Sequence, residues 1–326
     1  MIVRAAHHDD LEALMTLAAK AGKGLTTIPR DKNAMADRID ASVSSFARPT
    51  KNLTAETYLM VLEEADSSIS GLSAIYTNLG HDQPFYSYRL SRHAAHAPEI
   101  GVKAEASVLS LVNDFHGYDE IGTLFLDPAR RGGGRGKLLS FSRFMLMAAF
   151  PERFSTRVMA EMRGWTDEQG RSPFWEAVGR KFFHMEFSDA DVKSGISNRF
   201  IADLMPKVPI YTTLLPQEAQ DVIGITHEKT RPARALLEKQ GFLFREQVDV
   251  FDAGPCLEVD LANIPLVRGT RQTTLANLPD EALGAPALVA KTENNTVTVS
   301  YSMAAKGDIA RALGVTEDAP VLYSGL

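Results

Sequence analysis

The stretch from Thr123 to Phe144, TLFLDPARRGGGRGKLLSFSRF, constrains the fold more than any other part of this chain. Residues 121–126 have the apolar composition of a buried strand, and Pro128 holds the residue before it extended. Two arginines follow, then four glycines within five positions, then a segment that is apolar on nearly all sides, as in a buried helix. The sequence therefore predicts a strand, a basic glycine-rich loop and a core helix, in that order.

This loop is a candidate phosphate site, because the N-terminus of a helix presents unpaired N–H groups and a partial positive charge. A P-loop is excluded, since Gly136-Lys137 is followed by Leu138 and position 131 is not glycine. A G-x-G-x-x-G dinucleotide loop is excluded too, since Lys137 and Leu139 occupy the positions of its last glycine. A flexible turn with a solvated basic cluster is the simpler alternative.

A third pattern, R/Q-x-x-G-x-G/A after a strand, fits Arg131, Gly134 and Gly136. It resembles the pyrophosphate loop of the GCN5-related acyl-CoA N-acyltransferases. Around it the sequence predicts a strand at 1–6, helices at 11–22 and about 31–45, and a strand–turn–strand unit at 57–79. Residues 107–126 are predicted as a hairpin with its turn at 113–120. A strand at 157–164 and one helix at 172–183 follow.

The second half repeats part of this pattern. Residues 231–251 contain an amphipathic helix that ends at Gly241, followed by a strand, much as residues 172–187 do. An ordinary helix with a glycine C-cap is the alternative. We expect an α/β (α+β) fold of two tandem GCN5-related N-acyltransferase-like halves, with mixed sheets flanked by helices. The expected domains are 1–200, with the CoA loop, and 201–326, ending in a β-rich tail with one helix.

Composition narrows the class of protein. The 326 residues are 44% hydrophobic and 23% charged, as in globular proteins, and the net charge of −6 disfavours a nucleic-acid-binding surface. A single cysteine, Cys256, excludes an intrachain disulfide or a cysteine-based zinc site, and no histidine spacing matches a metal site. No apolar run reaches the length of a membrane span, and the N-terminus does not resemble a signal peptide. We expect a cytoplasmic protein without a metal.

Longer blocks resemble one family, the arginine N-succinyltransferases. They include TLFLDPARR, VMAEMRGWTDEQGRSPFWEAVGRKFF, VDVFDAGPCLEVDL and LMPKVPIYTTLLPQEAQDVIGITHEKTRPARALLEKQGF, and with GKGLTTIP they lie within about residues 1–262. The resemblance implies transfer of the succinyl group of succinyl-CoA to the α-amine of L-arginine. It implies no permanently bound cofactor and association of like or related chains.

The resemblance also implies roles for particular residues. The leucine of the TLFLDP strand that contacts succinyl-CoA in the family corresponds to Leu124, and the proton-donating histidine after QDVIG corresponds to His227. An exposed or helix-capping histidine is the alternative for His227. The expected CoA-binding residues are Leu124, Phe125, Leu126, Arg131, Gly132, Gly134, Gly136 and Lys137, with Arg130 and Arg135 nearby.

The acceptor's guanidinium needs carboxylates, and its own carboxylate needs a cation or N–H groups. Glu161 and Arg163, at alternate positions of the strand after the core helix, are the candidates, although a structural ion pair is equally compatible with them. Asp249, Asp252 and Glu258 are alternatives for the guanidinium. His184, Trp165 and Trp175 are expected to pack in the core.

Two rival functions remain. One keeps the fold and changes the substrate to ornithine, another amine or another acyl donor. The other is a noncatalytic acyl-CoA-binding module that regulates a partner. The intact TLFLDP strand and His227 favour an enzyme over such a module.

Overall fold

The computed structural model describes residues 1–21, 27–48, 54–187, 189–190, 199–278, 286–301 and 305–326, so the expected helix stop at Gly22 lies outside the described residues. The chain forms two compact units. Unit 1 comprises Met1–Asn78, Asp119–Val158 and Val259–Leu326, and unit 2 comprises Leu79–Tyr118 and Met159–Glu258. These ranges differ from the expected division at residue 200, because each unit gathers segments that are distant in sequence. The tandem relation of two halves stays a prediction.

Unit 1 is built on an antiparallel run of strands, ordered β11-β14-β12-β13-β1-β2-β3-β6. The strands are β1 (Ile2–Ala5), β2 (Thr57–Glu63), β3 (Ile69–Tyr76), β6 (Asp119–Leu126), β11 (Arg271–Thr274), β12 (Ala287–Glu293), β13 (Thr296–Tyr301) and β14 (Pro320–Gly325). β13 from the end of the chain pairs with β1 from its beginning. The tail is therefore an extension of the N-terminal sheet.

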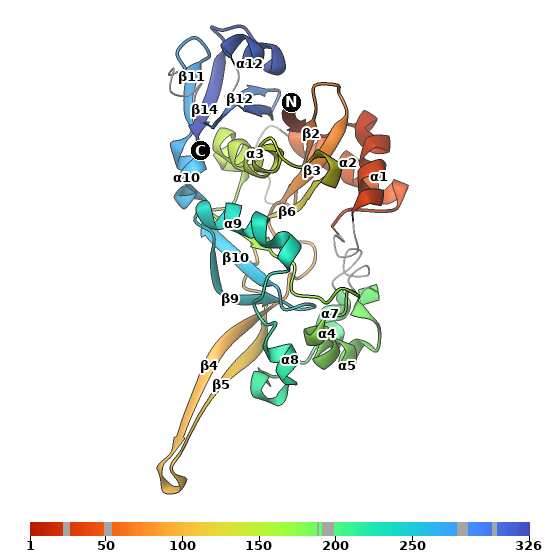
Figure 1. The fold of residues 1–326 in the computed structure, drawn as a ribbon, viewed down its shortest axis with the longest axis vertical. Helices are drawn as coiled ribbons and strands as arrows, with labels where there is room; N and C mark the ends of the chain where they lie inside the picture. Colours follow the sequence, from red (N-terminus) through yellow and green to blue (C-terminus); the bar gives the residue numbers. More distant parts are fainter. Residues whose placement is uncertain (22–26, 49–53, 188, 191–198, 279–285, 302–304) are drawn as a thin grey trace. The chain divides into compact units, whose positions relative to one another are not determined.

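Helices cover both faces of this sheet (Figure 1). α1 (Leu11–Lys20) and α2 (Lys32–Ala47) pack on Leu59, Val61, Leu72 and Ala74, whereas α3 (Arg135–Ala149) packs on the opposite face, where Leu139 approaches Gly71 and Ser73. The Asp31 side chain caps α2, as expected, by accepting the N–H groups of Asn33 and Ala34. Every residue of α3 from Leu138 to Met147 is buried, which confirms the predicted core helix.

The tail contributes α10 (Pro265–Gly269) and α12 (Lys306–Leu313), and α12 packs with Leu275, Val289 and Val321 in a small core of its own. β7 (Arg157–Glu161) and β10 (Pro255–Asp260) lie where the chain passes from one unit to the other. The expected α/β class, with a mixed sheet flanked by helices, is confirmed.

Unit 2 has the strand order β10-β9-β4-β5-β8. It contains β4 (Ser87–Ala97), β5 (Val102–Val112), β8 (Ile210–Tyr211), β9 (Leu243–Asp249), and helices α4 (Pro173–Ala177), α5 (Gly179–Phe183), α7 (Arg199–Leu204), α8 (Gln217–Gln220) and α9 (Arg231–Lys239). β4 and β5 form a long hairpin, paired from Ser87↔Val112 to Ala97↔Val102. The predicted hairpin of residues 107–126 is wrong, because β5 pairs with β4 and β8, while β6 pairs with β3.

Two local expectations in unit 2 are also corrected. The predicted helix at 172–183 is broken at Val178 (φ −118°, ψ −79°), because Gly179 packs so closely on the Trp175 ring that a Cβ there would lie 2.2 Å from it. His184 is exposed and ends α5 in a left-handed conformation (φ 51°), so it is not a packed core histidine. Trp175 is fully buried, and Trp165 is partly buried against the same core cluster.

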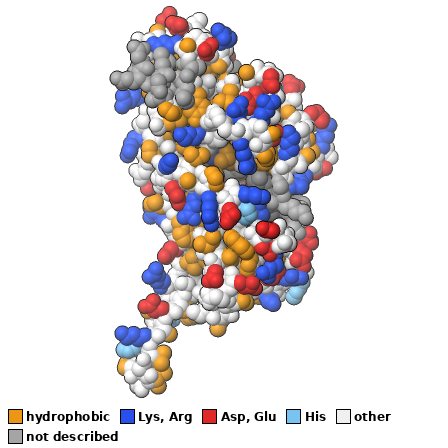
Figure 2. Space-filling view, viewed as in Figure 1, with side chains coloured by type: hydrophobic (Ala, Val, Ile, Leu, Met, Phe, Trp, Pro, Cys, Tyr) orange, Lys and Arg blue, Asp and Glu red, His pale blue; other side chains and the backbone are white. Residues whose placement is uncertain are grey.

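The end of the β4–β5 hairpin carries basic side chains, and Figure 2 shows them with the surrounding surface. Arg92, His93, His96 and Lys103 are all exposed there. Within the described ranges no three His, Cys, Asp or Glu side chains are grouped closely enough to hold a metal ion. Nor does any helix in those ranges have the length and apolar character that crossing a membrane would require.

Candidate functional site

The glycine-rich loop in unit 1 has the conformation that its glycines permit. Gly132, Gly133 and Gly134 have φ values of 99°, 58° and 78°, in the region that side chains with a Cβ rarely adopt. Asp127 anchors the start of the loop by accepting the Ala129 N–H at 3.0 Å and pairing with Lys20 Nζ at 2.6 Å. The loop therefore presents its backbone, unobstructed by Cβ atoms, at the start of α3.

The four basic side chains of the loop are not equivalent. Arg135 forms a two-pronged pair with Glu64, at 2.7 and 3.0 Å, and Arg130 lies 3.6 Å from Asp66. Arg131 and Lys137 form no hydrogen bond or ion pair with the residues that the structure describes. Arg135 thus has a structural task, and Arg131 and Lys137 are the cations left for a ligand.

β6 carries a β-bulge immediately before the loop. Leu72 pairs with Phe125, and Ala74 pairs with Gly122, so Thr123 and Leu124 together face Ser73. Thr123 has φ 51°, a strained value for a β-branched residue, and its hydroxyl lies 2.5 Å from Tyr76 Oη. The bulge interrupts the ladder at Leu124, which is the position where the family resemblance implies contact with succinyl-CoA.

A polar cluster beside the bulge was not predicted from the sequence. Burial raises the pKa of Glu120, also on β6, to about 7, although the charges of Arg38 and Arg143 oppose the shift. Arg38 donates to Tyr76 Oη at 2.6 Å, and burial lowers the pKa of Arg143 to about 9. The cluster holds a carboxyl group that can exchange a proton near neutral pH. No sequence pattern marks it, since Glu120 lay in a predicted turn.

In unit 2, His227 is held by its neighbours at the first position before a short 3-10 helix (Glu228–Thr230). Its N–H donates to the Arg163 carbonyl at 2.8 Å, and an antiparallel bridge joins Gly164 to Thr226. Its ring Nδ1 accepts the Lys229 N–H at 3.1 Å, so the neutral ring carries its proton on Nε2. His227 therefore does cap the helix, as in the alternative interpretation, and its Nε2–H group can still donate a hydrogen bond.

Glu161 and Arg163 lie at and just beyond the end of β7. Glu161 is the last residue of β7, so Arg163 lies beyond the strand rather than on it, which corrects the expectation. Arg163 donates to Thr166 Oγ1 at 3.2 Å, and its buried Nε has no hydrogen-bond partner among the residues described. The guanidinium of Arg163 thus retains an unused donor beside the backbone that holds His227.

The three alternative carboxylates are engaged elsewhere. Asp249 accepts the N–H groups of Phe251 and Asp252, at 2.8 and 2.9 Å, and Glu258 pairs with Arg245 at 3.1 Å. Asp252 accepts the N–H groups of Gly164 at 2.7 Å and Gly254 at 2.8 Å, and burial raises its pKa. These contacts favour structural roles, and Asp252 supports the segment that carries Arg163.

The surroundings of His227 lower its pKa below the ordinary value of 6.5, mainly through burial and then through the charges of Arg163 and Lys229. We expect Arg163→Met to raise this pKa, because the protonated ring loses a repelling charge. A proton NMR titration of the His227 ring measures it. Arg245→Met is the matched control and should leave the titration unchanged. An unchanged or lower pKa in Arg163→Met would refute the coupling.

Known proteins resemble this chain over most of its length. The family model described as arginine N-succinyltransferase beta subunit matches residues 1–266. The arginine N-succinyltransferase of Enterobacter sp. (strain 638) is 46% identical over 278 residues, 85% of this chain and 80% of that protein. The one from Shigella dysenteriae serotype 1 (strain Sd197) is 43% identical over 296 residues, 90% and 86% of the two chains.

A solved structure agrees with these relatives. The arginine/ornithine succinyltransferase subunit AI from Pseudomonas aeruginosa superposes with a TM-score of 0.87 and 31% identity, covering 99% of this chain and 98% of that one. Both the sequence blocks and the fold therefore lead to one assignment. The chain belongs to the arginine N-succinyltransferase family.

Proposed function

We propose that this acyltransferase moves the succinyl group of succinyl-CoA to the α-amine of L-arginine, giving N2-succinyl-L-arginine and CoA. Membership of the family supports the activity, and the relatives from Enterobacter and Shigella carry the name arginine N-succinyltransferase. The observation that carries the proposal is the bulged strand followed by the open glycine loop and a buried helix. That arrangement suits an acyl-CoA thioester.

In this proposal the CoA pyrophosphate binds the backbone N–H groups of Gly132, Gly134 and Gly136, with Arg131 and Lys137 as counter-charges. The pantetheine arm runs beside Leu124, Phe125 and Leu126. At the bulge, a backbone N–H at Leu124 can donate to the thioester oxygen as negative charge develops on it. One such donor contributes about 3 kcal/mol to transition-state stabilisation.

The reaction forms a C–N bond and breaks a C–S bond. The arginine ammonium group must first lose a proton so that its nitrogen can attack, and the leaving CoA thiolate gains one. We assign proton donation to His227 in its protonated form: the imidazolium gives its Nε2 proton to the CoA thiolate and returns to the neutral ring, whose Nδ1 accepts the Lys229 N–H.

The charged ends of the substrates need partners of opposite charge. The unused Nε donor of Arg163 supports a contact with a carboxylate, of arginine or of the succinyl tail. Glu161 is the proposed partner of the guanidinium. A cytoplasmic location and association of like or related chains complete the proposal.

Ornithine is the second candidate acceptor, because the solved Pseudomonas aeruginosa structure is of an arginine/ornithine succinyltransferase subunit. Purified protein should release free thiol only when succinyl-CoA and an acceptor are both present, and mass spectrometry should identify the succinylated product. Acetyl-CoA and L-ornithine in parallel reactions test donor and acceptor choice. CoA binding without thiol release for any pair would favour the noncatalytic alternative.

A further inference from the structure

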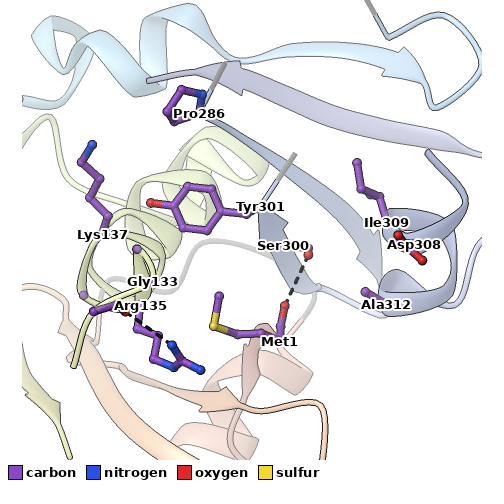
Figure 3. Close-up of a pocket in the computed structure, with 13 residues that line it drawn as sticks. Met1, Gly133, Arg135, Lys137, Pro286, Ser300, Tyr301, Asp308, Ile309 and Ala312 are labelled. Atoms are coloured by element: carbon purple, nitrogen blue, oxygen red, sulfur yellow. Dashed lines mark hydrogen bonds between the residues drawn. The ribbon is translucent and has the colours of Figure 1, made fainter. Parts of the chain in front are cut away.

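Unit 1 contains a cavity of about 670 Å³ between the glycine loop and the tail of the chain. Residues 132–137 line one side, and Tyr301, Ile309 and Ala312, from β13 and α12, line the other (Figure 3). Met1 lies at its base, where its carbonyl accepts a hydrogen bond from Ser300 Oγ at 3.3 Å. The tail, which lies beyond the part matched by the family model, thus forms one wall of this cavity.

The tail packs directly on the loop through Tyr301. A Cβ built on Gly134 would lie 3.0 Å from Cε2 of the Tyr301 ring and 3.2 Å from its hydroxyl oxygen. The ring therefore covers the backbone of the loop at the residue that precedes α3. Burial raises the pKa of Tyr301 to about 12, so its hydroxyl stays uncharged at neutral pH.

The two walls differ in chemistry. The loop wall supplies backbone N–H groups, the start of a 15-residue helix and Lys137, which has no partner among the described residues. The tail wall supplies the Tyr301 ring with Ile309 and Ala312, and its carboxylate, Asp308, pairs with Arg311 at 3.1 Å. A ligand that suits both has phosphate groups attached to a flat, apolar ring system, and the cavity volume is within the range of small-molecule sites.

We propose that the tail builds the subsite for the nucleotide part of acyl-CoA, with the Tyr301 ring packed on the adenine base and Lys137 beside the phosphates. The inference rests on the proposed use of a CoA thioester. It gives the tail a task in donor recognition that the glycine loop alone does not fulfil, since the loop offers phosphate contacts but no surface for a base.

The test compares Tyr301→Ala with Tyr323→Ala, which removes the same side chain from β14, where it packs on the small core around α12. Calorimetry measures binding of 3′-phosphoadenosine 5′-diphosphate, the nucleotide of CoA, to the full chain. We expect Tyr301→Ala to weaken binding about tenfold, the usual worth of stacking on an aromatic side chain. Tyr323→Ala should bind as the wild type does.

A second variant, Ala312→Phe, adds bulk to the cavity and should weaken binding at least as much. With succinyl-pantetheine, which lacks the nucleotide, both cavity variants should retain the wild-type kcat/KM. The inference is overturned if both variants bind the nucleotide as tightly as the wild type, or if the wild type does not bind it. It is also overturned if the variants lose as much kcat/KM with succinyl-pantetheine as with succinyl-CoA. Because calorimetry needs no turnover, a wild type that binds nucleotide without succinylating arginine would instead refute the proposed function.

Discussion

Replacing His227 with alanine lowers kcat for succinyl transfer by about 100- to 10,000-fold, the usual contribution of a positioned proton-transfer group. KM for succinyl-CoA changes little, because the glycine loop that we assign to CoA is untouched. Steady-state kinetics over a range of both substrates measure this. The alanine variant alone is ambiguous, since it also removes the cap of a helix.

His227→Asn separates the two roles of this side chain. Asparagine is among the best N-cap residues, so it restores the acceptor that the Lys229 N–H requires but cannot transfer a proton at neutral pH. We expect the asparagine variant to keep the wild-type melting temperature and to be as slow as the alanine variant. Recovery of turnover in His227→Asn would mean that the histidine serves only as a cap.

The sequence predicted the elements around the glycine loop well because their signals are local. Strand β6, the loop and α3 lie within thirty-one consecutive positions, 119–149, and each is defined by its own apolar or glycine pattern. The same is true of α2, whose cap Asp31 is the residue before it. Patterns of this kind need no knowledge of distant neighbours.

Pairing between strands was harder, because it depends on segments far apart in the chain. The prediction paired residues 107–112 with β6 in a hairpin, yet all eleven residues of β5 pair with β4. β13 pairs with β1, almost the whole chain away, so the cavity that the tail forms with the loop has no local signature. The polar cluster around Glu120 was missed for the same reason, because Arg38 and Arg143 lie in α2 and α3.

The type of a side chain also predicted its role less well than the contacts that it makes in the fold. All four cations of the loop looked suitable for phosphate, but Arg135 pairs with Glu64, the residue that follows β2. Asp252 looked suitable for a guanidinium, but its carboxylate accepts two backbone N–H groups. In each case a contact across the fold, rather than the residue type, decides the role.

Gly164→Ala is expected to destabilise unit 2 by at least about 3 kcal/mol, at the upper end for overpacking a closed site. A Cβ at Gly164 would lie 2.4 Å from the Asp252 carbonyl oxygen and 2.6 Å from its Oδ1. The carbonyl belongs to the backbone, so it cannot turn aside as a side chain would. The carboxylate oxygen of Asp252 that accepts the Gly164 N–H would be displaced as well.

Urea unfolding followed by tryptophan fluorescence measures this, because both tryptophans of the chain, Trp165 and Trp175, lie in unit 2. Gly170→Ala is the matched control: a Cβ there meets nothing within 4 Å, but φ is 83°. It should cost only about 1–2 kcal/mol, the strain of a left-handed backbone. Equal losses in the two variants would show that the contact with Asp252 contributes nothing.

Gly164→Ala should also lower the rate of succinyl transfer, because the backbone connects Gly164 to His227. Gly164 bridges Thr226, and the Arg163 carbonyl accepts the His227 N–H, so any shift of this segment moves the imidazole. A displacement of about 1 Å at a catalytic group can cost about 100-fold in rate. We therefore expect folded Gly164→Ala, assayed well below its melting temperature, to lose kcat, whereas Gly170→Ala keeps it. Full activity in folded Gly164→Ala would show that the contact between Gly164 and Asp252 does not determine the position of His227.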